Sequence, residues 1–154
     1  MNLEFHDNEF NQIIKDILEH NEFQKMRNIE HHGITRLDHS LKVSYYSYKI
    51  AKAMHLDYTE TARGGLLHDF FFSPEERNSK DRFLSTFTHP VKAIETANTH
   101  FELSKKEQDM IRSHMFPINI SVPKYLESWV VSGIDKVVAI SELSLKYKFK
   151  FRYA

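Results

Sequence analysis

Six polar residues recur along the chain at intervals typical of one helix plus a connection, roughly 20 to 30 residues. They are His39, the adjacent pair His68 and Asp69, His89, His114 and Asp135. Imidazole nitrogens and carboxylate oxygens are ligands of divalent transition metals. Inward-facing side chains on neighbouring helices of a bundle can converge on one point. The spacing therefore predicts a metal site built from several helices.

The number of candidate ligands bears on the number of ions. Six donors exceed the four that one tetrahedral zinc uses, so we expect two divalent ions with Asp69 between them. The metal could be Fe, Mn, Co, Ni or Zn, because His and Asp accept all of them. A simpler interpretation exists for each residue: His39 could be a hydrogen-bonded core residue, His89 a helix cap, and Asp135 the partner of a cation. Burial of two unpaired Asp residues would be costly, which favours the metal.

The elements that must position these residues are predicted to be helices, which gives an all-α fold of about six helices. Apolar periodicity predicts helices over residues 8–21 and 37–55, then one capped by Asp57 or Thr59 that ends near residues 66–72. A polar loop is expected over residues 73–82, and Pro90 predicts a helix that begins near Thr88 or His89. A capping box at residues 104–107 opens the next helix, and the last begins after Pro123. The Gly64-Gly65 pair suggests a close helix crossing.

The end of the chain shows a different pattern. Aromatic or aliphatic residues alternate with Lys and Arg over residues 144–154, which predicts a short β-strand with four positive charges and no acid. We expect its apolar face to cover the bundle, and because a lone strand needs a pairing partner, a homodimer through this strand is a further expectation. Contact with nucleic acid or an anionic membrane is the less favoured interpretation.

Composition narrows the class of protein. Lys plus Arg and Asp plus Glu both number 21, so no general basic field attracts nucleic acid. The chain has no Cys, which excludes disulfides, thiolate metal sites and cysteine nucleophiles. The 154 residues suit one domain with one core. No apolar run is long enough to span a membrane and the first residues do not resemble a signal peptide, so we expect a cytoplasmic protein.

The motifs around these residues resemble those of the HD-domain superfamily, helical metal-dependent phosphohydrolases named after an adjacent His-Asp pair. The matching segments are LDHS, GLLHDFF and GIDKV, and the resemblance implies an HD core over about residues 30–140. FTHPVKA and IRSHMFP resemble the branch that holds two metals. The resemblance implies that His39, His68, Asp69 and Asp135 bind the first ion, and that Asp69, His89 and His114 bind the second. The chain departs from some relatives, because residues 70–72 are Phe where a Lys is often found, and no Gly-Tyr-Pro signature of cyclic-di-GMP phosphodiesterases follows.

The resemblance implies hydrolysis of a small phosphomonoester or nucleotide-type phosphoester by a metal-activated water, with His68 and Asp69 at the catalytic centre. Phosphate also needs cations, and the candidates for substrate binding are Arg36, Arg63, Arg82 and Lys92. Lys136 follows the last ligand, and in similar enzymes a Lys at this place faces the active site. Either His31 or His32 could donate a proton to the leaving group, and His32 is the candidate that we take.

Two other classes of function compete with hydrolysis. Similar two-metal sites that hold iron activate O₂, so a di-iron oxygenase is the first rival. The second rival is a non-catalytic module in which the metal is structural or senses a ligand. Hydrolysis that persists without O₂ separates the first pair of functions, and a folded but inactive Asp69 variant separates an enzyme from a binding module.

Overall fold

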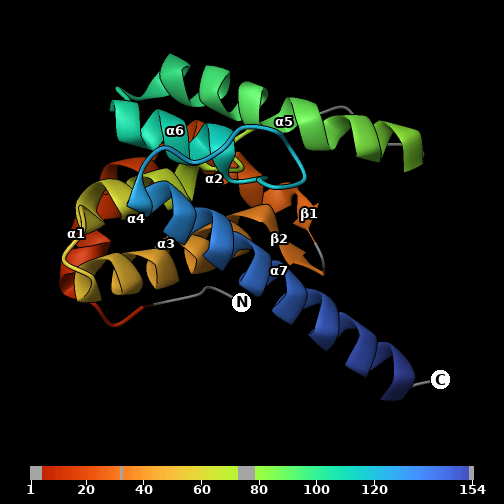
Figure 1. Cartoon of the computed structure of the whole chain (residues 1–154). Helices are drawn as coiled ribbons and strands as arrows, with labels where there is room; N and C mark the ends of the chain where they lie inside the picture. The colour runs from red at the N-terminus through yellow and green to blue at the C-terminus, as the bar shows by residue number, and fades with distance from the viewer. Residues whose placement is uncertain (1–4, 32, 73–78, 153–154) are drawn as a thin grey trace.

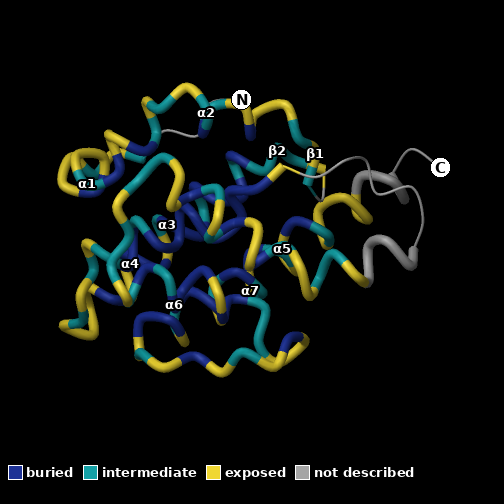
Figure 2. Tube along the Cα trace, turned by 90° about the horizontal axis from the view of Figure 1, so that it is seen from above, coloured by how far each residue is buried: buried dark blue, intermediate teal, exposed yellow. Residues whose placement is uncertain are grey.

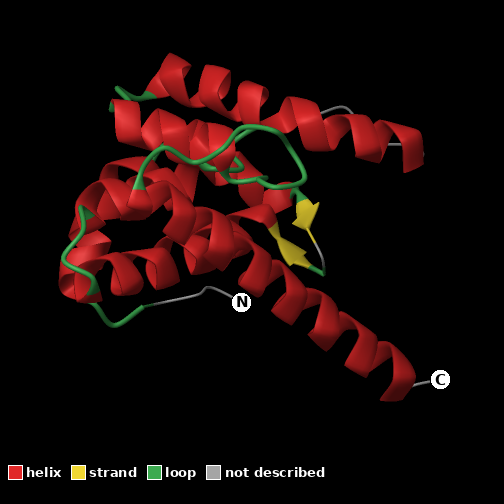
Figure 3. Cartoon of the chain, viewed as in Figure 1, coloured by secondary structure: helices red, strands yellow, loops and turns green. Residues whose placement is uncertain are grey.

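The chain folds into a bundle of helices with one short hairpin (Figures 1 and 3). The computed structural model describes residues 5–31, 33–72 and 79–152. The helices are α1 (Asn8–Leu18), α2 (Asn21–Gln24), α3 (Arg36–Ala53), α4 (Tyr58–Leu67), α5 (Ser79–His100), α6 (Lys105–Ser113) and α7 (Leu126–Arg152). A 3-10 turn, η1 (Lys25–Asn28), precedes antiparallel strands β1 (Glu30–His31) and β2 (Ile34–Thr35). The all-α fold class is confirmed.

Several helices begin at a side chain that accepts a hydrogen bond from the first turn. Asp7, Thr35 and Asp57 accept from the backbone N–H three residues further on. Ser104 and Glu107 bond each other's backbone N–H in a complete capping box. The predicted caps of α4 and α6 are therefore confirmed, and they fix where the two helices that end at His68 and His114 begin.

The bundle is organised around α3, which packs against both α4 and α7. Helix α6 packs against α4, α5 and α7, and α1 covers α4. The larger core cluster joins apolar side chains of α1, α3 and α4, and a smaller one joins Val43, Met110, Val131 and Val138. Figure 2 shows the buried segments where α3, α4, α6 and α7 come together. Polar residues on the inner faces of these helices are therefore removed from water.

The Gly64-Gly65 pair of α4 lies at two close helix crossings, as expected. A Cβ atom added at Gly64 would lie 2.4 Å from Sδ of Met110 on α6, and one added at Gly65 would lie 3.1 Å from Cα of Ser44 on α3. The hydroxyl of Ser44 also donates to the Ala62 carbonyl at 2.6 Å. The glycines allow α4 to approach both neighbours at the level of the predicted ligands.

Two predicted boundaries are wrong. The first helix ends at Leu18 instead of residue 21, and α5 begins at Ser79 instead of near Thr88. The hydroxyl of Thr88 and Nδ1 of His89 bond carbonyls one turn earlier, so neither residue caps a helix. Pro90 removes only one backbone donor, and the helix continues on both sides of it. Residues 73–78 of the predicted loop lie outside the described residues.

The predicted C-terminal strand is also wrong, because α7 continues as one helix to Arg152. No Gly or Pro follows Gly133 to end the helix. The alternating pattern reflects no buried sheet face: Leu145 and Tyr147 are 51% and 59% exposed, and this half of α7 extends away from the bundle beside the hairpin (Figure 1). The argument for a homodimer paired through a strand loses its basis. None of the described helices is long and apolar enough to cross a membrane.

Candidate metal centre

The six predicted ligands, which start far apart in the sequence, meet at one place in the bundle. His39 comes from α3, His68 and Asp69 follow the end of α4, His89 lies in the middle of α5, His114 ends α6, and Asp135 belongs to α7. Neighbouring donor atoms in the group lie 3.0–3.6 Å apart. The structure therefore brings together every residue predicted as a ligand.

Three of the four imidazole rings are held in the same way. In each, Nδ1 lies within hydrogen-bond distance of a backbone carbonyl one turn earlier: His68 with Gly65 at 2.7 Å, His89 with Ser85 at 3.0 Å, and His114 with Ile111 at 2.7 Å. A carbonyl only accepts, so Nδ1 carries the proton and Nε2 carries the lone pair. Metal-ligating histidines are fixed in this manner, with the second nitrogen bonded to the protein. The local helix geometry thus prepares three nitrogen donors.

Asp69 lies between these donors. Its Oδ1 is 3.5 Å from Nε2 of both His89 and His114, and its Oδ2 is 3.6 Å from Nε2 of His68. The two carboxylate oxygens therefore face opposite sides of the cluster. This placement suits a carboxylate that bridges two cations.

The pair His89 and His114 fits a shared cation. Their Nε2 atoms are 3.0 Å apart, although both nitrogens are expected to carry lone pairs. Two lone pairs at this distance repel unless a proton or a cation lies between them. Two ligands bound at right angles about 2.1 Å from one ion also lie about 3.0 Å apart. The spacing of these nitrogens is that of two ligands on one metal ion.

On the other side of Asp69, Nε2 of His68 has no hydrogen-bond partner among the described residues. This nitrogen is buried, and Oδ1 of Asp135 lies 3.5 Å away. The same carboxylate oxygen is 3.0 Å from Nε2 of His39, and the three donor atoms lie within 4.8 Å of one another. A buried nitrogen without a partner is unfavourable, and a cation would satisfy it.

Glu142 is a residue that the sequence analysis missed. Its Oε2 lies 2.9 Å from Nδ1 of His39, and its Oε1 lies 3.3 Å from Nζ of Lys42. The carboxylate therefore holds the His39 ring with Nε2 toward the cluster, as the backbone carbonyls do for the other rings. Glu142 follows Asp135 by two helical turns, a signal that became visible only with α7 treated as one helix.

The electrostatics agree with this arrangement. Burial alone would lower the pKa of His39, but hydrogen bonds with Asp135 and Glu142 raise it to about 10. Burial lowers the pKa of His89 to about 4, so this ring is neutral at pH 7. Burial favours the protonated acid at Asp69 and Asp135, but the neighbouring imidazoles outweigh it and hold both carboxyl pKa values below their usual range. At pH 7 the His89 ring is neutral and both carboxylates are ionised, the forms that bind metal, whereas the His39 ring holds a proton that a cation would displace.

The other predicted residues are placed less uniformly. Lys136 directs its ammonium to the carbonyl of His114 at 2.7 Å and to Ser132, and burial lowers its pKa. Arg63 donates to Asp16 and Glu107, which links α4 to α1 and α6 instead of facing a substrate. Lys92 is exposed on α5, one turn after His89. His32 and the side chain of Arg82 lie outside the described part of the structure.

Arg36 is connected to the cluster through an aromatic ring. Its Nη1 donates to the Phe71 carbonyl at 2.7 Å, and its guanidinium carbon lies 4.1 Å above the Phe71 ring. Phe71 in turn stacks on His89, with ring centroids 5.1 Å apart. Arg36 therefore contacts a residue that packs against the His89 ring.

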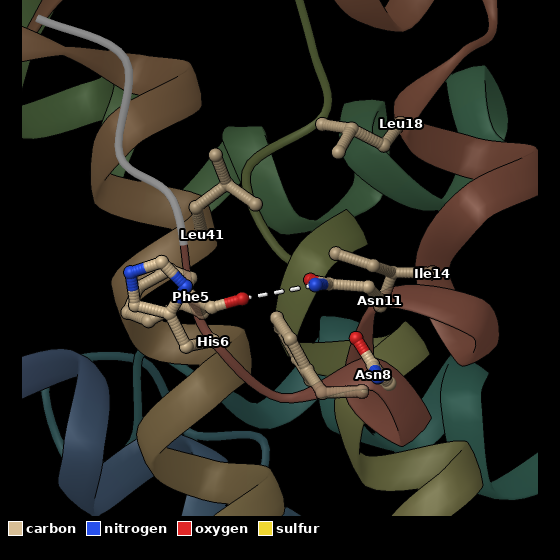
Figure 4. A pocket seen from close by; sticks show the side chains of 8 residues that line it. Phe5, His6, Asn8, Asn11, Ile14, Leu18 and Leu41 are labelled. Carbon is tan, nitrogen blue, oxygen red and sulfur yellow. Dashed lines mark hydrogen bonds between the residues drawn. The ribbon is translucent and has the colours of Figure 1, made fainter.

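Two surface pockets are lined by described residues of the bundle. One of about 460 Å³ between α3 and α7 is lined by Tyr46, Ile50 and Val137, with Glu142 at its edge. Another, of about 280 Å³, is lined by Phe5, His6 and Leu41 among others, and Asn11 donates to the Phe5 carbonyl there (Figure 4). None of the six predicted ligands lines either pocket.

The fold and the cluster together define a class: an all-α protein in which helices direct four imidazoles and two carboxylates to one buried metal centre. The HD domain family model matches residues 36–140. The chain belongs to the HD-domain family, and the range includes all six predicted ligands, whereas Glu142 lies beyond it. No curated protein and no solved structure matches the chain.

Proposed function

We propose that this protein is a metal-dependent phosphohydrolase that acts on a small phosphomonoester or a nucleotide-type phosphoester. One observation supports the proposal above the others: the Asp69 carboxylate lies between two sets of imidazoles, with Nε2 of His68 on one side and Nε2 of His89 and His114 on the other. The first set comprises His39 and His68, and the Asp135 carboxylate lies against both. The second set comprises His89 and His114. This donor set suits two divalent ions.

When bound, such ions lower the pKa of a water toward neutrality and take up negative charge on phosphoryl oxygens. The contribution of the chain is to hold the donors before the substrate arrives. The carbonyls of Gly65, Ser85 and Ile111 fix three rings, and Glu142 fixes His39. No donor then has to turn during turnover, which is the advantage of a preorganised site.

Arg36 is the proposed phosphate-binding residue. A guanidinium suits phosphate because it presents several N–H donors in a fixed plane. Its contacts with Phe71 place it one ring away from His89, at the side of the proposed second ion. Lys136 acts differently: it bonds the carbonyl of His114, so we propose that it positions that ligand and does not contact the substrate.

The test is a hydrolysis screen on metal-loaded protein with a panel of phosphomonoesters and nucleotides, run with and without O₂. We expect phosphate release in both atmospheres, a loss of about 100-fold or more in Asp69→Asn, and normal activity in His6→Ala, whose ring is exposed beside another pocket. Arg36→Ala should raise KM more than it lowers kcat. Turnover only with reduced iron and O₂ would contradict the proposal, as would activity that survives in Asp69→Asn.

A further inference from the structure

His31 lies beside the proposed metal centre but outside the range that the HD domain model matches. Its ring centroid is 4.5 Å from that of His39. Donor atoms of His31, His39 and Asp69 all lie within 4.8 Å of one another, although His31 belongs to β1 and not to the helical bundle. The hairpin therefore adds a third imidazole to the side of the cluster that already holds His39 and His68.

The hairpin is anchored on both sides. The backbone N–H of Arg36 donates to the Ile29 carbonyl at 2.8 Å, and His31 pairs with Ile34 across the strands. Gly33 has a φ of +92°, a conformation that favours glycine, and the Lys146 side chain of α7 packs over it. Nζ of Lys146 also lies 3.9 Å from Glu30. The position of His31 is thus set by α3 and by the C-terminal half of α7 (Figure 1).

Only one nitrogen of His39 can serve the cluster, because Nδ1 faces Glu142. The His39 nitrogen available to an ion shared with His31 is therefore the same Nε2 that lies 3.0 Å from Asp135. Ligands on opposite sides of one ion, each bound at about 2.0 to 2.4 Å, are separated by about 4.0 to 4.8 Å. The donor atoms of His31, His39 and Asp69 lie within 4.8 Å of one another, so all three can bind one ion.

We infer that His31 is an additional ligand of the ion held by His39, His68, Asp69 and Asp135. The inference rests on the proposed metal centre and extends it. It makes the two ion positions unequal: the first has imidazoles from His31, His39 and His68, whereas the second has those of His89 and His114. The first ion is then the more tightly held, and the second is the one with more room for a substrate phosphate.

The experiment is a calorimetric titration of metal-free protein with Co²⁺, which gives the number of ions bound and the Kd of each. The variants are His31→Ala, His31→Gln and His31→Glu, with His6→Ala as the matched control. Gln and Glu have the same shape, but only Glu restores a charged ligand. We expect His31→Ala and His31→Gln to weaken the tighter ion by at least about 10-fold, since even outer-shell partners cost that much. The Kd of the weaker ion should change by less than about threefold in every variant. Both Kd values of His31→Glu and of the control should stay within about threefold of wild type.

Each other outcome has a defined meaning. Binding of both ions by His31→Ala and His31→Gln as in wild type would overturn the inference, even if hydrolysis slowed, because His31 would then serve the substrate. Equal weakening of both ions would overturn it too. A wild-type protein that binds no Co²⁺ would refute the proposed metal centre itself. Circular dichroism of the metal-free variants checks folding, and if His31→Ala is unfolded, the Gln and Glu pair decides.

Discussion

His39 is bonded on both ring nitrogens by carboxylates, Asp135 on Nε2 and Glu142 on Nδ1. In the metal-free protein this environment raises the pKa of the ring to about 10, against 6.5 for an ordinary His. A cation at Nε2 would replace that proton. His39 would then stabilise the fold in the metal-free protein and bind the ion in the metal-bound protein.

A pH dependence of stability follows from this shift. A group whose pKa is higher in the folded state contributes stability that is fully present below pH 6.5 and is lost as the pH rises through about 10. We expect the free energy of unfolding of the metal-free protein, measured by urea titration, to fall between pH 7 and pH 10. The fall should be smaller in His39→Gln and unchanged in His6→Ala. Constant or rising stability over this range would contradict the account of His39.

Glu142 holds His39 without belonging to the predicted ligands. We expect Glu142→Ala to weaken binding of the first ion by about 10- to 100-fold, the range measured for outer-shell partners. Glu142→Gln should weaken it less, because an amide oxygen still accepts from Nδ1 but has no charge. The Kd of each ion for Co²⁺ measures the effect. Unchanged affinity in Glu142→Ala would show that the 2.9 Å contact does not orient the ring.

The residues with chemistry were predictable when type and spacing sufficed. All six proposed ligands are predictable as His and Asp residues at helix-sized intervals, and the structure brings these residues together. Arg63 is predicted from the sequence to bind substrate, because no local pattern indicates its partners. These partners, Asp16 and Glu107, lie 47 and 44 residues away. The sequence indicates His31 as a candidate proton donor and not as a ligand, because its proximity to His39 depends on a hairpin that no sequence pattern indicates.

At the scale of elements, the close crossing of α3 and α4 positions His68. Gly65 provides both the contact surface for Ser44 and the carbonyl that fixes the His68 ring. A side chain added there meets backbone atoms, which cannot move aside as a flexible side chain can.

We therefore expect Gly65→Ala to destabilise the protein by about 1 to 3 kcal/mol. Gly133→Ala is the matched control, since a Cβ at this exposed position of α7 meets nothing within 4 Å. That change should be neutral or stabilise by about 0.5 to 1 kcal/mol, the cost of Gly in a helix. Thermal melts of both variants give the comparison. Equal effects in the two would mean that the crossing tolerates a methyl group.

Element boundaries were predictable where a cap marks them and failed where local signals compete. Asp57 and the Ser104–Glu107 capping box start their helices as expected. Pro90 resembles a first-turn proline but lies inside α5. Alternation after residue 144 resembles a strand, but α7 continues as a helix to Arg152, which keeps the backbone groups hydrogen-bonded within one element.

For the whole molecule, the proposed ligands come from α3, α5 and α7 and from the ends of α4 and α6. Ions at this centre would therefore connect five elements of the bundle. A ligand that binds only the folded state stabilises it by about 2.7 kcal/mol at 100 times its Kd. We expect the Tm of the wild type to rise with added Co²⁺ or Mn²⁺ and to return to its starting value with chelator. The rise should be smaller in Asp69→Asn. A Tm that ignores metal would contradict this coupling.

The most direct test of the central claim is the metal content per chain, by elemental analysis of protein purified without chelator or affinity-tag nickel. We expect about two ions in the wild type and about one in both His89→Ala and His114→Ala, because these residues are the proposed ligands of the second ion together with Asp69. No metal in the wild type, or the same single ion in all three proteins, would contradict a centre for two ions.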